Sequence, residues 1–193
     1  MGFEAFHCAR RVPVPARVAR EQGKIARMKL GSFDVLVQAL DKGRVRYLVA
    51  GGLAVNAHGY LRFTRDVDLV IQLDPDNVIA AFRAMEGIGY RPIVPVTASD
   101  LADPAKRTAW HLDKGMTVLN FWCDAHPDTP VDVFVTEPFD FDEEYARALV
   151  KPLGSVAVRF VSIPSLIRMK EIAGRPQDKI DIDYLRKLAD AGK

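Results

Sequence analysis

The sequence has few cysteines, no long hydrophobic run and almost no net charge. Its two cysteines, Cys8 and Cys123, lie far apart without the spacing of a metal site, which is typical of a protein in a reducing compartment. No apolar run approaches the ~20 residues that cross a bilayer, and the N-terminus lacks the apolar segment of a signal peptide. A formal net charge of +2 does not itself indicate nucleic-acid binding. We therefore expect a cytoplasmic protein without membrane contact.

The positive charge is concentrated at the N-terminus. Residues 1–29 hold seven basic and two acidic residues and are interrupted by Pro13 and Pro15. Such a segment buries too little apolar surface to offset its ordering entropy, so we expect a mobile basic arm, with contact to RNA as the alternative. Residues 30–193 have the length of one ordinary domain, and its last part, about residues 162–193, is predicted to be helical.

A glycine pair follows the first predicted strand. Residues 46–50 form a short, mostly apolar run, as expected of a buried strand. Gly51 and Gly52 then remove side chains at the point where the backbone turns, so that amide groups can approach an anion. A short helix is predicted over residues 53–58, and its N-terminus would point at the same anion.

Two acidic residues open the next predicted strand, residues 67–73. Successive side chains of a strand alternate between faces, so Asp66 and Asp68 share one face while the apolar residues between and after them point into the core. Neighbouring carboxylates repel each other without a cation, and Mg²⁺ prefers carboxylate oxygens together with phosphate and water. With Arg62 and Thr64 just ahead, the pattern predicts a triphosphate beside Mg²⁺ or Mn²⁺. A simple turn and a solvated strand edge are the alternatives.

A third acidic residue lies in a later predicted strand. Residues 116–123 and 131–135 read as two strands joined by a proline-containing turn, which is typical of a hairpin. Asp132 is flanked by valines that point to the opposite face. An isolated aspartate within an apolar strand is disfavoured unless a partner compensates its charge. Asp132 is therefore a candidate metal ligand, with a salt bridge to an arginine as the alternative.

These residues carry a resemblance to a known family. The pattern resembles the polymerase-β-type nucleotidyltransferase superfamily and, more narrowly, small bacterial nucleotidyltransferases grouped with AbiEii-type toxins. The similarity covers roughly residues 33–190. It implies an α/β fold, with a nucleotidyltransferase core of a small mixed sheet and helices followed by a short helical C-terminal segment. The residues that carry it are Gly51-Gly52, followed by Arg62-x-Thr64-x-Asp66-x-Asp68.

The resemblance also implies an activity, the transfer of a nucleoside monophosphate from an NTP to an acceptor hydroxyl or phosphate. The acceptor would be tRNA, for a toxin controlled by an antitoxin protein, or a small molecule such as an antibiotic. A non-catalytic nucleotide-binding module is a third alternative. The implied catalytic residues and metal ligands are Asp66, Asp68 and Asp132, and the implied nucleotide contacts include Gly51, Gly52, Arg62 and Thr64.

A second set of charged residues lies near the C-terminus. Helices are predicted over residues 162–173 and again after the break at Gly174. The order Lys170, Arg175, Asp178, Asp181 resembles the tail of the AbiEii-type group, which implies that Lys170 meets nucleotide phosphates and that Arg175 and Asp178 support the nucleotide site. The alternative is a set of salt bridges between the helices.

For the rest of the chain, the sequence predicts single helices, strands and turns. Asp74 followed by Pro75 predicts a helix start, because aspartate is a favoured N-cap and proline a favoured first helical residue. Residues 91–114 read as less regular turns, and residues 156–161 predict one more strand.

Overall fold

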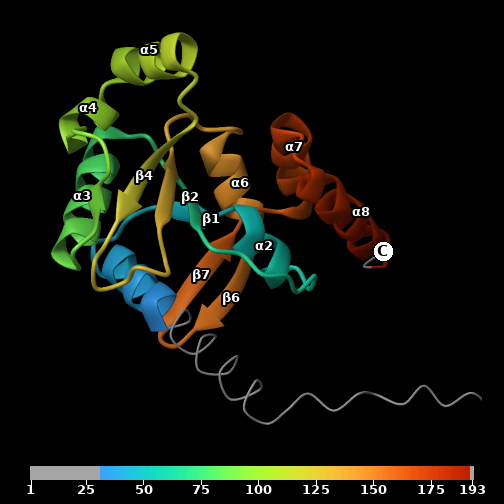
Figure 1. Ribbon diagram of the computed structural model, residues 1–193. Helices are drawn as coiled ribbons and strands as arrows, with labels where there is room; N and C mark the ends of the chain where they lie inside the picture. The colour runs from blue at the N-terminus through green and yellow to red at the C-terminus, as the bar shows by residue number, and fades with distance from the viewer. Residues whose placement is uncertain (1–30, 192–193) are drawn as a thin grey trace, which may run out of the picture.

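The computed structural model describes residues 31–191 and shows a mixed sheet packed with helices (Figure 1). The predicted α/β class is confirmed. The expected basic arm, residues 1–29, lies outside the described residues. The strands are β1 (Tyr47–Val49), β2 (Val67–Ile71), β3 (Arg91–Pro92), β4 (Val118–Trp122), β5 (Val131–Phe134), β6 (Leu149–Leu153) and β7 (Val156–Phe160). The helices are residues 31–42, α2 (Gly51–Ala57), α3 (Pro75–Gly87), α4 (Ala98–Ala102), α5 (Pro104–Lys114), α6 (Phe141–Arg147), α7 (Ile163–Ala173) and α8 (Pro176–Ala191).

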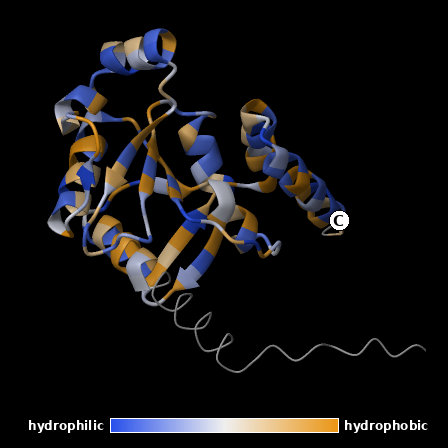
Figure 2. Cartoon of the chain, in the orientation of Figure 1, coloured by the Kyte–Doolittle hydropathy of each residue, from blue (hydrophilic) through white to orange (hydrophobic). Residues whose placement is uncertain are grey.

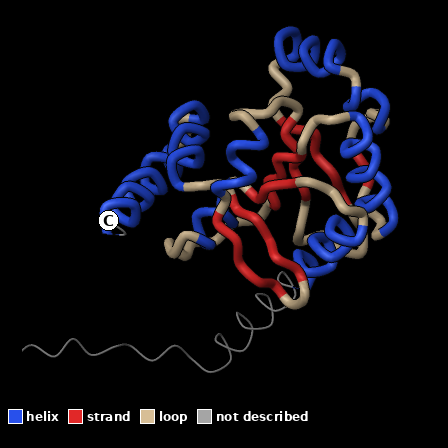
Figure 3. The backbone as a smooth tube through the Cα atoms, turned by 180° about the vertical axis from the view of Figure 1, so that it is seen from behind, coloured by secondary structure: helices blue, strands red, loops and turns tan. Residues whose placement is uncertain are grey.

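The seven strands form one sheet in the order β3-β4-β5-β2-β1-β7-β6 (Figure 3). The two central strands that carry the acidic residues, β2 and β5, run parallel. β4 pairs with β5 as the predicted antiparallel hairpin, and β1 pairs with β2 antiparallel. The end of β1 and the start of α2 therefore lie beside the start of β2.

One face of the sheet is covered by α3 and the helix of residues 31–42. Phe82 of α3 meets Phe121 of β4 edge to face at 5.2 Å between ring centroids, and both are buried. On β2, Val67 and Leu69 point to this face and are buried, whereas Asp68 between them points to the other. Polar residues alternate with apolar ones along the strands in Figure 2, as this arrangement requires.

The opposite face is only partly covered. α6 packs there through Phe141 and Tyr145, whose rings lie 5.3 and 4.6 Å from the Arg46 guanidinium. Gln72, which follows β2, accepts a hydrogen bond from Arg46 at 3.0 Å, so α6 lies over the C-terminal end of β2. The acidic residues lie at the N-terminal ends of β2 and β5 on this face, and their side chains are partly exposed.

The predicted helical C-terminal segment is confirmed. α7 ends at Gly174, whose φ of +64° is the left-handed conformation that glycine adopts without strain, and α8 then packs back along α7 (Figure 1). Tyr184 of α8 stacks on Tyr60 of the loop after α2 with ring centroids 3.8 Å apart. The two C-terminal helices are thus attached to the part of the chain between α2 and β2. Among residues 31–191, no helix has the length and apolar character that a bilayer span requires.

Two local expectations are wrong. Residues 91–114 are not irregular, since they contain β3, α4 and α5. Thr97 and Asp100 form a reciprocal capping box at the start of α4, and Asp103 caps α5 ahead of Pro104. The second difference concerns α2, which starts at Gly51 and so includes both glycines in its first turn.

Candidate active site

The three predicted acidic residues lie together on the open face of the sheet. Asp68 of β2 is directly opposite Asp132 of β5 in the parallel register. Asp66 precedes Asp68 by two residues and lies on the same face. Asp132 therefore comes from the strand beside the Asp-x-Asp pair, as the family resemblance implies.

Burial and neighbouring carboxylates raise the pKa of Asp68 and of Asp132. The pKa of Asp68 is raised from 3.8 to about 6, chiefly by burial and then by the charges of Asp132 and Asp66, while Lys170 and Arg175 partly oppose the shift. Burial also raises the pKa of Asp132, with a further contribution from Asp66. The described residues thus compensate the negative charge of the cluster only in part, which is the condition under which a carboxylate group attracts a cation.

Asn120 is a site residue that sequence reasoning missed. Its Nδ2 donates a hydrogen bond of 2.7 Å to Asp132 Oδ1, because Asn120 and Asp132 are opposite each other in the β4–β5 hairpin. The bond favours the charged form of Asp132 and fixes one of its oxygens. The sequence does show a polar residue inside the apolar strand of residues 116–123. It does not indicate the strand register that places this residue opposite Asp132.

Both glycines are required by close packing at the start of α2. Gly51 has a φ of +57°, and a Cβ atom there would overlap the Asp68 carboxylate. A Cβ atom on Gly52 would overlap the Thr64 side chain and lie 3.0 Å from Arg62 Nη2. The glycine pair thus brings the backbone of α2 against the acidic strand and against the residues that precede it.

Arg62 joins the loop before β2 to α8. Its Nε and Nη2 donate to Asp181 Oδ2 at 3.1 and 2.9 Å. The Asp181 side chain is fully buried, accepts from Gln177 at 3.0 Å and lies 2.6 Å from Lys170 Nζ. Lys170 is buried too and also contacts Asp178 Oδ1 at 3.0 Å. The C-terminal charges therefore form a buried network of ion pairs.

This network contains the salt bridges that the sequence left as an alternative. Burial alone would raise the pKa of Asp181, but hydrogen bonds from Lys170, Gln177 and Arg62 outweigh it and lower the pKa. Lys170 also acts electrostatically on Asp68, so it lies near the acidic cluster. Its expected contact with a nucleotide phosphate stays a prediction.

Arg175 occupies the link between α7 and α8. Its backbone N–H donates to Asp178 Oδ2 at 3.1 Å, and its side chain is exposed. The guanidinium lowers the pKa of both Asp68 and Asp132, so its charge faces the acidic cluster. Of the predicted nucleotide contacts, Arg175 is the one that combines an exposed cation with proximity to the carboxylates.

The donor set fits a divalent cation that takes part of its coordination from substrate. Within residues 31–191, no three His, Cys, Asp or Glu side chains close up into a complete metal site. Mg²⁺ is usually held by one or two carboxylates together with phosphate oxygens and water. The pair Asp68 and Asp132, with Asp66 beside it, supplies such carboxylates.

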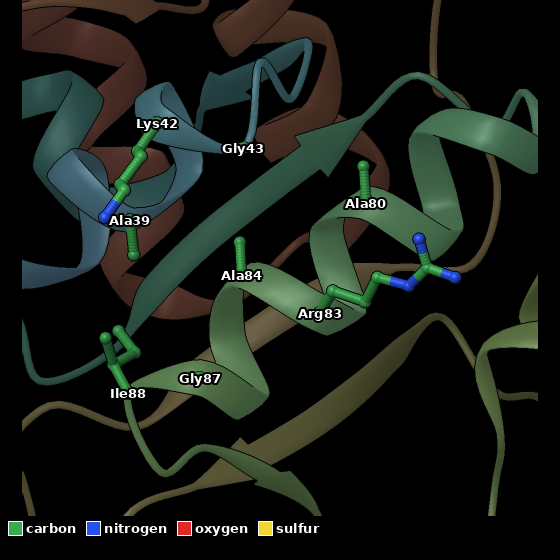
Figure 4. Close-up of a pocket in the computed structure, with 8 residues that line it drawn as sticks. All are labelled: Ala39, Lys42, Gly43, Ala80, Arg83, Ala84, Gly87 and Ile88. Carbon is green, nitrogen blue, oxygen red and sulfur yellow. The ribbon is translucent and has the colours of Figure 1, made fainter.

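A pocket on the other side of the molecule does not belong to this site. It lies between the helix of residues 31–42 and α3, which cover the face opposite the carboxylates (Figure 4). Small residues dominate its lining, and Lys42 and Arg83 are its charged members. It contains none of the predicted site residues.

Solved structures share this architecture. The antibiotic-resistance factor ANT(2'')-Ia superposes with a TM-score of 0.54 at 14% identity, over 88% of this chain and 85% of that protein. An antigenic nucleotidyltransferase-like protein from Paracoccidioides brasiliensis gives 0.51 at 18% identity, over 83% of this chain and 75% of that protein. The chain has the nucleotidyltransferase fold.

The nucleotidyltransferase fold agrees with the broader of the two resemblances in the sequence. The lincosamide antibiotic adenylyltransferase LnuA, in its lincomycin-bound form, gives a TM-score of 0.48 at 14% identity, over 77% of this chain and 90% of that protein. No protein-family model matches the sequence, and no curated protein matches it. The narrower resemblance to AbiEii-type toxins therefore stays a prediction.

Proposed function

We propose that this protein is a metal-dependent nucleotidyltransferase that moves a nucleoside monophosphate from an NTP to an acceptor. The observation that carries the proposal is the direct pairing of Asp68 with Asp132 on an open sheet face, with Asp66 beside them. Half-buried carboxylates that face one another across paired strands destabilise the fold unless a cation joins them. The nucleotidyltransferase fold of the chain supports the same reaction class.

Each acidic residue has a proposed role. Asp66 and Asp68 would hold Mg²⁺, or Mn²⁺, for the triphosphate, and Asp132 accepts the proton of the acceptor hydroxyl. The acceptor oxygen forms a bond to the α-phosphorus while the bond from that phosphorus to the bridging oxygen breaks, and pyrophosphate leaves. Asn120 keeps Asp132 oriented for this proton transfer through its 2.7 Å hydrogen bond. The metal, when bound, neutralises charge on the phosphates.

The positive groups around the cluster suit the triphosphate. Arg175 offers an exposed guanidinium that faces Asp68 and Asp132. Backbone N–H groups of Gly51 and Gly52 are proposed to contact phosphate oxygens, since glycine has no side chain of its own at these positions. Thr64 is proposed to contact the nucleotide beside them. Asp178 and Arg62 act indirectly, because their ion pairs position Lys170 and α8.

Two acceptors are consistent with this chemistry. A tRNA acceptor, with an antitoxin partner, is supported by the basic sequence of residues 1–29. A small-molecule acceptor is supported by the fold shared with the antibiotic-resistance factor ANT(2'')-Ia. In both cases the reaction at phosphorus is the same.

The test is incubation of the protein with each NTP labelled at the α-phosphate. Total tRNA and a panel of hydroxylated antibiotics are offered separately, with and without Mg²⁺. We expect Mg²⁺-dependent transfer of label to one acceptor class and release of pyrophosphate. Binding of NTP without transfer to any acceptor would instead indicate a non-catalytic nucleotide-binding module.

A further inference from the structure

The open sheet face continues beyond the carboxylates onto β4 and β3. Asn120 is opposite Asp132 in the hairpin, and the backbone N–H of Ile93 donates to the carbonyl of Asn120 at 2.9 Å. Ile93, Asn120, Asp132 and Asp68 therefore form one row across four chain segments. Neighbouring strands are about 4.8 Å apart, so Ile93 lies about 10 Å from Asp132.

Trp122 lies on the same face, in the next row. It follows Asn120 by two residues on β4, so both side chains point to the side of the sheet that carries Asp132. Val67 of β2 is opposite Val131 of β5. Continuing this register by one residue before each strand places Asp66 in the same row across the sheet as Trp122. The Trp122 indole thus lies on the same sheet face as the carboxylates, on the strand next to that of Asp132.

This part of the face exposes large apolar side chains beside a pocket. Trp122 is 41% exposed and Ile93 is 64% exposed. The Trp122 indole is held in place, because its Nε1 donates to Asp124 Oδ1 at 3.1 Å. A fixed aromatic face with its polar atom already engaged is suited to stacking on a flat ligand surface. The pocket is lined by Gly89, Arg91, Pro92, Ile93, Trp122 and Asp124.

The charges of this pocket disfavour a polyanion. Of the residues that line it, Arg91 is the cation, and its Nη1 is engaged by the carbonyls of Glu86 and Tyr90 at 2.8 and 2.7 Å. Asp124 adds a negative charge to the same lining. A nucleic-acid strand requires several unengaged cations for its phosphates. The positive groups of the site, Lys170 and Arg175, come instead from the α7–α8 side.

We propose that Trp122 and Ile93 form the acceptor subsite and that the acceptor is a small molecule with a hydroxylated ring that carries no phosphate groups. The ring stacks on the indole, and its hydroxyl extends toward Asp132. The inference rests on the proposed function, because it places the acceptor on the side of Asp132 away from Arg175 and the glycine pair. The triphosphate and the acceptor then approach the cluster from opposite sides.

The first test uses fluorescence, because the chain has two tryptophans, Trp110 and Trp122. In a Trp110→Phe background Trp122 is the sole indole, and in a Trp122→Phe background it is absent. Lincomycin and other sugar- or cyclitol-bearing antibiotics are titrated into both proteins without NTP. We expect saturable quenching or a spectral shift in the first background and none in the second. An equal response in both backgrounds, or none in either, overturns the proposal whatever the enzyme does.

The second test is kinetic and uses the full chain. Trp122→Ala is expected to raise the acceptor KM by about tenfold, from lost stacking, while the KM for NTP is unchanged. Trp122→Phe should recover part of the loss. Leu112→Ala is the matched control, because Leu112 is also a large exposed apolar residue, at 73% exposure. It lies on α5, which precedes the start of β4, whereas Trp122 lies at the end of β4. Equal KM values for Trp122→Ala and Leu112→Ala, or transfer to tRNA alone, overturn the proposal. Failure of the proposed function itself appears separately, as absence of transfer by the wild-type protein.

Discussion

Replacing Asp68 by asparagine is expected to stabilise the protein when no divalent cation is present. The folded-state pKa of Asp68 is raised from 3.8 to about 6, chiefly by burial and then by Asp132 and Asp66. Each pKa unit corresponds to about 1.4 kcal/mol, so the ionised carboxylate costs up to about 3 kcal/mol at neutral pH. For a chain of this length that corresponds to roughly 6–12 °C in melting temperature.

The sign of the pH dependence follows from the raised pKa. Below about pH 4 the Asp68 carboxyl is protonated in the folded and unfolded states, so the substitution has little effect there. Between about pH 4 and 6 the unfolded state loses its proton first, and the wild-type protein becomes progressively less stable than Asp68→Asn. Above about pH 6 the difference reaches its full value. Mg²⁺ should reduce it, because a bound cation offsets the repulsion in the wild-type protein.

Urea unfolding at several pH values, in EDTA and in Mg²⁺, measures this difference directly. Asp113→Asn serves as the control, because Asp113 is exposed on α5, and it should change the free energy of unfolding by less than about 0.5 kcal/mol. A stability difference for Asp68→Asn that is the same at pH 4 and pH 8 would refute the reasoning. So would a variant less stable than wild type at pH 8.

Three further outcomes are expected. Gly51→Ala should lose transfer and destabilise the fold by at least about 1–2 kcal/mol, because a Cβ at φ +57° is strained and overlaps the Asp68 carboxylate; an active, equally stable variant would contradict this packing. Lys170→Met should cost about 3–5 kcal/mol in urea unfolding, since it removes the buried cation that Asp178 and Asp181 share and leaves Arg62 as the cation paired with Asp181, whereas the exposed Lys179→Met should cost almost nothing; equal effects would remove Lys170 from the network. A chain beginning at Met28 should unfold cooperatively and bind NTP in calorimetry. If removing residues 1–27 lowers the affinity for tRNA, the lost affinity should be the component that decreases with added salt. An unfolded Met28 chain would show that the arm belongs to the fold.

Part of the acidic cluster was predictable because it depends on short-range rules. Alternation along a strand places Asp66 and Asp68 on one face, and the hairpin of residues 116–135 brings Asp132 into the sheet. The closeness of Asp132 to the Asp-x-Asp pair came from the family resemblance, and the parallel register confirms it. Asp74 with Pro75 likewise marks the start of α3, since both capping bonds are local.

The rest of the site depends on contacts between distant parts of the chain. Arg62 and Asp181 are 119 residues apart, and no local pattern indicates that their side chains meet. The burial of Lys170 follows from the packing of α8 along α7, which hydrophobic periodicity alone does not fix. The helices within residues 91–114 carried local signals, because Asp103 with Pro104 repeats the cap that marks α3, but the polar composition of the segment favoured turns.

The central claim is that the paired carboxylates carry out nucleotidyl transfer, and Asp132→Asn tests it most directly. The substitution keeps the shape of the side chain and an oxygen that accepts the hydrogen bond from Asn120, but it removes the proton acceptor. The measurement is Mg²⁺-dependent transfer of α-phosphate label by this variant, alongside calorimetric binding of NTP. The account predicts NTP binding close to that of the wild-type protein and a loss of transfer of at least about a hundredfold. Transfer at the wild-type rate by Asp132→Asn would contradict it.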